Sequence, residues 1–186
     1  MERYMVHLKN VSYSPREAQE LLKLASDLVA NGVIVRDARV SKKYVEFDVS
    51  LPEEASLEAV LRGLENISPV VEFEQVIERH MTKEEAISRA VRLFNDEKYW
   101  SAHEALEQVW KNTSGSEKAL LNGLILIAAA FVHDEKGEAD ICRSILSRAA
   151  AKFAGISGSY HGLDIDLIKS QVQDILQSGT ILRFSI

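Results

Sequence analysis

Side chains that could bind a metal ion are concentrated in the stretch LFNDEKYWSAHEALEQVW, residues 93–110. On an α-helix, His103, Glu107 and Trp110 share one face, because they stand at i, i+4 and i+7. Glu104 lies one step round, at the rim of the same face. Imidazole and carboxylate ligands together suit Zn, Fe or Mn. The spacing therefore predicts a polar helix face that could bind a divalent metal such as Zn or Mn.

A second set of polar residues interrupts the apolar helix predicted for residues 117–134. Asn122 and His133 are 11 residues apart, about three helical turns, and so lie on one face. If this helix packs antiparallel to the preceding one, His103 and Glu107 could face one of these interruptions, as in the metal sites of helical bundles. The predicted binding pocket is lined by Tyr99, His103, Glu107, Trp110, Asn122 and His133.

Three interpretations of these residues stay open, and the third is a cluster exposed at the surface. In the first, His103, Glu107 and His133 are metal ligands, and Glu104 is the general base of a metal-assisted hydrolysis, accepting a proton from metal-bound water. The motif is H-E-x-x-E, without the second His of the zinc-protease motif H-E-x-x-H. In the second, the His and Glu side chains satisfy each other through hydrogen bonds and only stabilise the bundle.

Other reactive side chains have no recognisable partner pattern. The sequence has no Gly-rich phosphate loop, nucleophile elbow or Cys-pair zinc signature, so phosphoryl transfer and serine hydrolysis lack their usual residues. Cys142 falls on a helix rich in Ile and Ala, which predicts a buried, inert thiol. His7, His80 and His161 have no acidic residue at ligand spacing and are expected at the surface.

Residues 1–80 show the order β-α-β-β-α-β, which predicts a ferredoxin-like sandwich. The apolar residues of its strands alternate with polar ones, as expected for an antiparallel sheet with helices on one face and the other face open. An acidic row, Glu72, Glu74 and Glu78, is expected on the solvated face of the last strand. The predicted strands are 4–9, 33–40, 44–49 and 70–77, and the predicted helices are 14–30 and 52–66.

Residues 81–186 form the second predicted domain, an all-α bundle of about five helices. The fold class is therefore α+β. Residues 117–134 are apolar almost all round, which predicts the central helix of the bundle. The tail 180–186 is β-prone and could pair with a free sheet edge. The predicted helices are 82–94, 99–111, 117–134, 138–153 and 163–177.

The composition indicates a globular cytoplasmic protein. Of the 186 residues, 46% are hydrophobic and 27% charged, which excludes disordered and collagen-like chains. The net charge of −6 has the wrong sign for nucleic-acid binding, so no such partner is expected. The apolar run 119–132 has 14 residues, too few to span a bilayer, and the N-terminus has no signal-peptide core. A partner protein, a small ligand or a second copy on the open sheet face or the bundle remains a candidate.

Residues 85–177 resemble domain-of-unknown-function family 309. The family signature is matched at Phe94, Asn95, Tyr99, Ala102, His103, Glu104, Leu106, Glu107 and Trp110, and a second segment at Gly123, Leu124, Ile125, His133 and Gly137. Gly162, Leu163 and Asp164 are similar to a further family motif. Asn122 stands where the family usually has Gln. The resemblance implies a compact helical bundle without an assigned activity. The sequence thus indicates an uncharacterised cytosolic protein with a His/Glu pocket, structural or ligand-binding, or alternatively a metal-dependent hydrolase.

Overall fold

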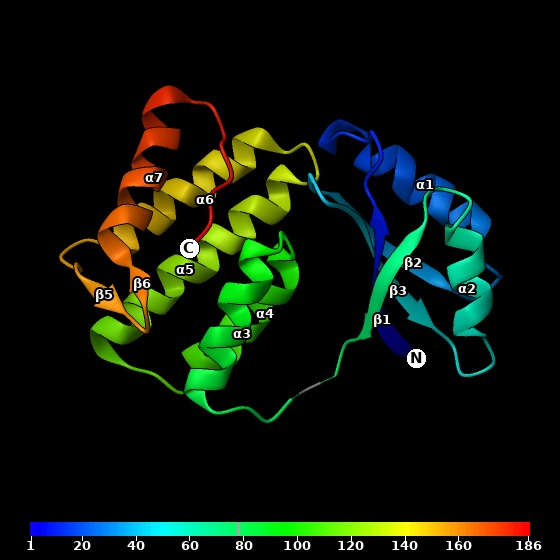
Figure 1. The fold of residues 1–186 in the computed structure, drawn as a ribbon, viewed down its shortest axis with the longest axis horizontal. Helices are drawn as coiled ribbons and strands as arrows, with labels where there is room; N and C mark the ends of the chain where they lie inside the picture. The colour runs from blue at the N-terminus through cyan, green and yellow to red at the C-terminus, as the bar shows by residue number, and fades with distance from the viewer. Residues whose placement is uncertain (78) are drawn as a thin grey trace. The chain divides into compact units, whose positions relative to one another are not determined.

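The structure is a computed structural model that describes residues 1–77 and 79–186. It divides into two compact units. Unit 1 comprises Met1–Arg79 with Glu135–Gly137, and unit 2 comprises His80–Asp134 and Glu138–Ile186. Each unit has its own hydrophobic core. Figure 1 shows a sheet with the helices α1 and α2 in the first unit, whereas the second unit is mostly helical. The predicted α+β class is confirmed at this level.

A four-stranded antiparallel sheet forms the framework of unit 1. The strands are β1 (Glu2–Lys9), β2 (Ile34–Val40), β3 (Tyr44–Leu51) and β4 (Val70–Gln75), in the spatial order β2-β3-β1-β4. Val6 lies opposite Phe47 on one side and Phe73 on the other. Val6 and Phe47 are fully buried, together with the apolar faces of α1 (Ala18–Leu28) and α2 (Leu57–Leu64). The period-two alternation therefore identified the core face of the sheet.

Local capping explains where the helices of unit 1 begin. Ser14 and Glu17 form a capping box around a short 3-10 turn, Pro15–Glu17, that leads into α1. The second helix is shorter than the predicted range 52–66. It begins after Ser56, whose hydroxyl accepts a hydrogen bond from the backbone N–H of Ala59. Strand β4 ends at Gln75, and Glu78 of the predicted acidic row lies outside the described residues.

Unit 2 is built from α3 (Lys83–Asn95), α4 (Tyr99–Trp110), α5 (Gly115–Asp134), α6 (Ala139–Lys152) and α7 (Ile165–Ser178). The α5 helix packs against both α4 and α6, as expected for the central helix. The last helix begins two residues later than predicted. Leu163–Asp164 instead pair with Ser159–Tyr160 in a small hairpin, and the positive φ angles of His161 (47°) and Gly162 (84°) make its tight turn.

The α5 helix is longer than its apolar run. It has 20 residues, which by length and composition would suffice to cross a bilayer, although the apolar run within it has 14. Its burial is what identifies its environment: Leu121, Ala128, Ala130 and Phe131 are completely inaccessible within the bundle. The α5 helix is therefore the core helix of this bundle.

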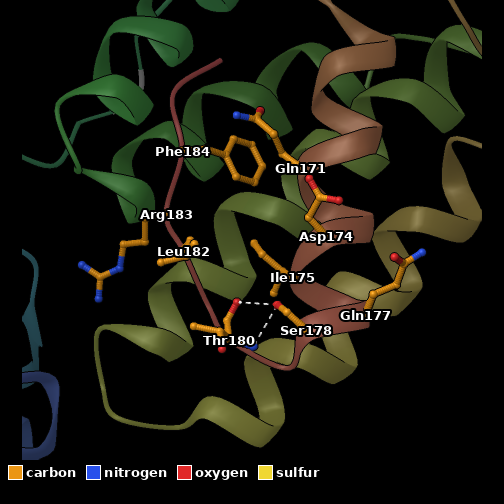
Figure 2. Close-up of a pocket in the computed structure, with 9 residues that line it drawn as sticks. All are labelled: Gln171, Asp174, Ile175, Gln177, Ser178, Thr180, Leu182, Arg183 and Phe184. Atoms are coloured by element: carbon orange, nitrogen blue, oxygen red, sulfur yellow. Dashed lines mark hydrogen bonds between the residues drawn. The ribbon is translucent and has the colours of Figure 1, made fainter.

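The tail 180–186 packs within unit 2 and forms no strand, so the expected pairing with a sheet edge is wrong. The side chain of Asn95 donates to the carbonyl of Ile186 and accepts from its N–H, both at 2.8 Å. Arg183 donates to Asp134 at 2.6 Å. Phe184 contacts the rings of Phe94 and Phe131, with ring centres 6.2 and 5.3 Å apart. Figure 2 shows Leu182, Arg183 and Phe184 running beside α7.

Gly123 provides a test of how tightly this bundle is packed. A Cβ atom added there would lie 2.6 Å from the ring of Phe153, which is completely buried on the other side of the contact. A helical Gly→Ala change ordinarily stabilises by about 0.5–1 kcal/mol. We expect Gly123→Ala instead to lower the free energy of unfolding by about 1–3 kcal/mol, because the core is overpacked. Urea unfolding measures this.

The double variant Gly123→Ala/Phe153→Leu is the matched control. The smaller Leu side chain relieves the contact, so adding Gly123→Ala in the Phe153→Leu background should cost much less than in the wild type. An equal penalty in both backgrounds, or a Gly123→Ala variant as stable as wild type, would contradict the described contact.

Candidate functional site

The buried side of α4 fixes the direction of its polar side chains. Tyr99 lies edge-on to Phe94, with ring centres 5.0 Å apart, and contacts Phe131 at 5.1 Å. Below it, Ala102 and Leu106 are buried in the core of unit 2. With these residues inward, the 3.6-residue period turns positions 103, 104 and 107 away from the core. Tyr99, predicted to line a pocket, is therefore a core residue.

His103, Glu104 and Glu107 form the polar cluster of α4. One ligand atom from each of the three residues lies within 4.8 Å of the other two. All three residues are partly buried, and the His103 side chain is 18% exposed. The spacing i, i+1, i+4 brings them together because the first and last lie one turn apart and Glu104 flanks His103. The structure thus assembles two of the three predicted ligands with the residue predicted as the base.

His103 and Glu107 make few polar contacts with the rest of the described chain. His103 Nδ1 is buried without a hydrogen bond, and its nearest carboxylate oxygen is Glu104 Oε1 at 3.5 Å. Its ring stacks on Trp100, with ring centres 5.7 Å apart and planes inclined by 11°. The Glu107 carboxylate forms no hydrogen bond or ion pair with another described residue. Three ligand-type groups therefore converge without satisfying each other.

His133 and Asn122 lie on α5 and do not join this group. His133 Nδ1 is 2.5 Å from Glu138 Oε2, a pair that closes the turn between α5 and α6. Tyr99 contacts Phe131, and α4 and α5 run antiparallel, so His103 and His133 lie in opposite directions from that contact. One turn of α4 alone separates Tyr99 from His103 by about 6 Å along the axis. Asn122 is partly buried nearer the start of α5.

Trp110, at the end of α4, is held by a different contact. The ammonium group of Lys118 lies 4.5 Å from the centre of its ring, a cation–π distance. Its indole N–H is buried without a hydrogen-bond acceptor among the described residues. Trp110 therefore stabilises the start of α5, and the structure gives no contact between it and the His103 ring.

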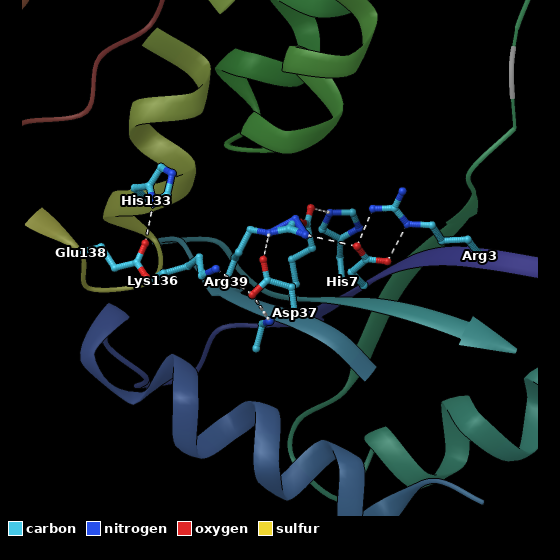
Figure 3. Close-up of polar contacts among 10 residues, drawn as sticks. Arg3, His7, Asp37, Arg39, His133, Lys136 and Glu138 are labelled. Carbon is cyan, nitrogen blue, oxygen red and sulfur yellow. Dashed lines mark hydrogen bonds and ion pairs between the residues drawn. The ribbon is translucent and has the colours of Figure 1, made fainter. Parts of the chain in front are cut away.

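The sequence analysis missed a second polar cluster, on the face of the unit 1 sheet opposite the helices (Figure 3). His7 is 3% exposed, and its Nε2 lies 2.7 Å from Glu46, so the prediction of an unpartnered surface histidine was wrong. Arg39 donates to the same carboxylate at 2.5 Å, and Arg3 makes two hydrogen bonds to Asp48. Cross-strand register brings these residues together, and their separation in sequence gave no signal.

Shifted pKa values occur away from the α4 cluster. Hydrogen bonds from Lys83 and Tyr160 lower the pKa of Glu117. Burial, together with the bond to Glu117, raises the pKa of Tyr160. Burial also raises the pKa of the Cys142 thiol to about 12. Glu117 and Tyr160 connect α3, α5 and the small hairpin through their hydrogen bonds. Their pKa shifts therefore reflect packing.

Comparisons with known proteins give one family match, within unit 2. Residues 87–145 match the family "Domain of unknown function (DUF309)". The expected resemblance is confirmed over these residues. A conserved hypothetical protein from Thermus thermophilus, known from its crystal structure, is 29% identical over 48% of this chain and 94% of its own, with a TM-score of 0.43. No curated protein matches this chain.

The fold explains several residues of the signature predicted from the sequence. Phe94 belongs to the aromatic core, Asn95 holds the tail, and Gly123 admits the ring of Phe153. Gly162 makes the hairpin turn, and Asp164 caps α7 by accepting a hydrogen bond from the N–H of Leu167. In the polar cluster, His103 stacks on Trp100, and ligand atoms of Glu104 and Glu107 lie within 4.8 Å of it.

Cys142 tests whether thiol chemistry can be excluded. Its side chain is fully buried, and a pKa raised from 9 to about 12 lowers the thiolate fraction roughly a thousandfold at pH 8. We expect negligible reaction with Ellman's reagent in the native protein and one thiol per chain after unfolding in guanidinium chloride. Rapid reaction of the native protein at pH 8 would contradict the burial of this thiol.

Proposed function

We propose that unit 2 binds a divalent metal ion through His103 Nδ1 and the carboxylates of Glu104 and Glu107. The observation that carries the proposal is the mutual approach of these ligand atoms, within 4.8 Å, without hydrogen bonds among them. Ligands at about 2.0–2.1 Å from a tetrahedral zinc ion lie about 3.3 Å apart. His103 Nδ1 and Glu104 Oε1 are already at 3.5 Å. Small side-chain rotations would complete the geometry.

The distances favour a metal site over a packing network. A His–carboxylate pair that satisfies itself has a contact of about 2.7–2.9 Å. Elsewhere in the chain such pairs do form, since His7 and Glu46 are 2.7 Å apart. At His103 the nearest carboxylate is farther away, and Glu107 is not bonded to its neighbours. Two carboxylates would also neutralise the charge of a dication.

The ligand set indicates which ion and which chemistry the site would support. One imidazole and two carboxylates suit zinc or manganese, and three protein ligands leave a coordination position open. When bound, such an ion supplies Lewis acidity and lowers the pKa of a coordinated water. Metal-assisted hydrolysis is therefore the reaction class of the proposal. The Trp100 ring, stacked on His103, would hold the imidazole plane in place.

Glu104 has two alternative roles in this proposal. As the third ligand, Glu104 takes the place of His133, which the sequence predicted as a ligand. His133 instead pairs with Glu138 at 2.5 Å. As a general base, Glu104 would leave His103 and Glu107 as the only ligands from this cluster. The side chain of Glu104 is 43% exposed, whereas that of His103 is 18% exposed. This accessibility at the rim of the site suits either role.

The finer fold assignment is also a proposal. The element order β-α-β-β-α-β and the strand order β2-β3-β1-β4 support a ferredoxin-like sandwich for unit 1. Helices α3 to α7 support a bundle of about five helices for unit 2. In this arrangement the metal ligands all come from one helix, so the site needs no residue from unit 1.

The first test is metal stoichiometry of untagged protein after incubation with zinc or manganese and removal of free ion. We expect close to one ion per chain in the wild type and none in His103→Ala. Loss of a ligand should weaken binding at least about 100-fold, since even supporting residues contribute 10- to 100-fold. The matched control, His133→Ala, removes an imidazole outside the cluster and should retain the ion.

Circular dichroism shows whether each variant is folded. Equal metal contents in wild type and His103→Ala would overturn the proposal, as would loss of the ion only in His133→Ala.

The role of Glu104 is tested with Glu104→Gln, which preserves the size of the side chain. If Glu104 is a ligand, calorimetric titration should give a weakened zinc affinity. If it is a base, the affinity should remain and any hydrolytic activity should fall. We expect the first result, because Glu104 Oε1 is the carboxylate oxygen nearest to His103 Nδ1. An unchanged affinity would remove Glu104 from the ligand set.

A further inference from the structure

A groove runs between α7 and the tail 180–186. Its volume is about 730 Å³, within the range of roughly 300–1,000 Å³ that is typical of small-molecule sites. Figure 2 shows Gln171, Asp174 and Ile175 of α7 on one side and Leu182, Arg183 and Phe184 of the tail on the other. The groove lies entirely within unit 2 and uses none of the proposed metal ligands.

The walls of the groove are held in place by contacts outside it. Phe184 packs against Phe131, and Asn95 makes two hydrogen bonds to Ile186. Arg183 donates to Asp134 at 2.6 Å. The tail therefore has a defined position although it forms no regular secondary structure. An ordered wall favours binding, because less conformational freedom is lost when a ligand enters.

The apolar surface of the groove is unusually accessible. Leu182 is 69% exposed, although it lines the groove beside buried Ile175. Phe184 contributes an aromatic ring that is only partly buried. These side chains offer contact to the apolar body of a ligand a few carbon atoms across.

The polar groups of the groove specify the head group of that ligand. The carbonyl oxygen Oε1 of Gln171 is buried and accepts no hydrogen bond among the described residues. Asp174 is exposed and has no ion pair there. The cation in the lining, Arg183, is neutralised by Asp134, and Figure 2 shows its guanidinium group directed away from α7. Unsatisfied acceptors and an unpaired carboxylate call for a donor with positive charge.

We propose that this groove is a binding site for an amphipathic ammonium ligand, an organic amine with an apolar body. The ammonium group donates hydrogen bonds to Asp174 and, once the buried Gln171 amide has rotated toward the groove, to Gln171 Oε1. The apolar body lies against Ile175, Leu182 and Phe184. The site is independent of the metal site on α4, so either can be present without the other.

The test uses two probes with the same apolar body and opposite charge, 4-phenylbutylamine and 4-phenylbutyrate. Each is titrated into isotopically labelled full-length protein and followed by amide chemical shifts. We expect the amine to shift resonances of residues 171–184 saturably and the carboxylate to leave them unchanged. Equal shifts with both probes, or shifts spread over the chain, would overturn the proposal.

Two variants and a control assign the head-group contacts. Asp174→Asn should weaken amine binding about two- to fivefold, the range expected for an exposed ion pair. Asp27→Asn removes the same charge from an exposed position on α1 and should change nothing. Gln171→Leu removes the unsatisfied acceptor, so it should keep the protein folded while weakening amine binding. Unchanged amine affinity in both Asp174→Asn and Gln171→Leu, with folding confirmed by the amide spectrum, would overturn the proposal.

Discussion

The rotation of α4 about its own axis is the constraint on which the candidate site depends. The rings of Phe94, Tyr99 and Phe131 pack within 5–6 Å of one another, measured between ring centres. Ala102, one turn below Tyr99, has no accessible surface, so α4 sits closely against its neighbours. A rotation that moved His103 would have to remove these aromatic contacts. Apolar packing thereby determines that three ligand-type side chains share the opposite face.

Unit 1 contains a His–carboxylate pair in direct hydrogen-bond contact, His7 with Glu46. His7, Arg39 and Glu46 are each at most 5% exposed, and Glu46 receives close contacts from both of the others. Buried charges need such partners, because an isolated one carries a desolvation penalty of several kcal/mol. In the cluster on α4, His103 is more exposed than His7, and its nearest carboxylate oxygen lies at 3.5 Å instead of 2.7 Å. This contrast within one chain is why we assign a ligand to the second cluster and a structural role to the first.

Periodicity and capping predicted much of the fold, and sequence separation limited the rest. The alternating strand residues located the core of unit 1. The predicted helix 82–94 begins within one residue of α3, where Thr82 and Glu85 form a capping box. The short hairpin before α7 was missed, because two-residue strands have no measurable period. The pairing of His7 with Glu46 was missed because cross-strand register follows from the whole sheet.

The candidate site was only partly predictable, because helix spacing can be read from the sequence and packing between helices cannot. Residues one turn apart on one helix, such as His103 and Glu107, can be placed together from sequence alone. The alignment of one helix against another cannot be predicted in this way, because it depends on which aromatic rings pack against each other. The contact between Tyr99 and Phe131 sets that alignment and directs His133 to Glu138 at the far end of α5.

The most direct test of the metal assignment is X-ray absorption spectroscopy of the zinc-loaded protein. The account predicts a first shell of nitrogen and oxygen atoms at about 2.0–2.1 Å that includes a single imidazole. That imidazole signal should remain unchanged in His133→Ala. A shell containing two imidazoles, or one without any imidazole, would contradict a site built from His103, Glu104 and Glu107.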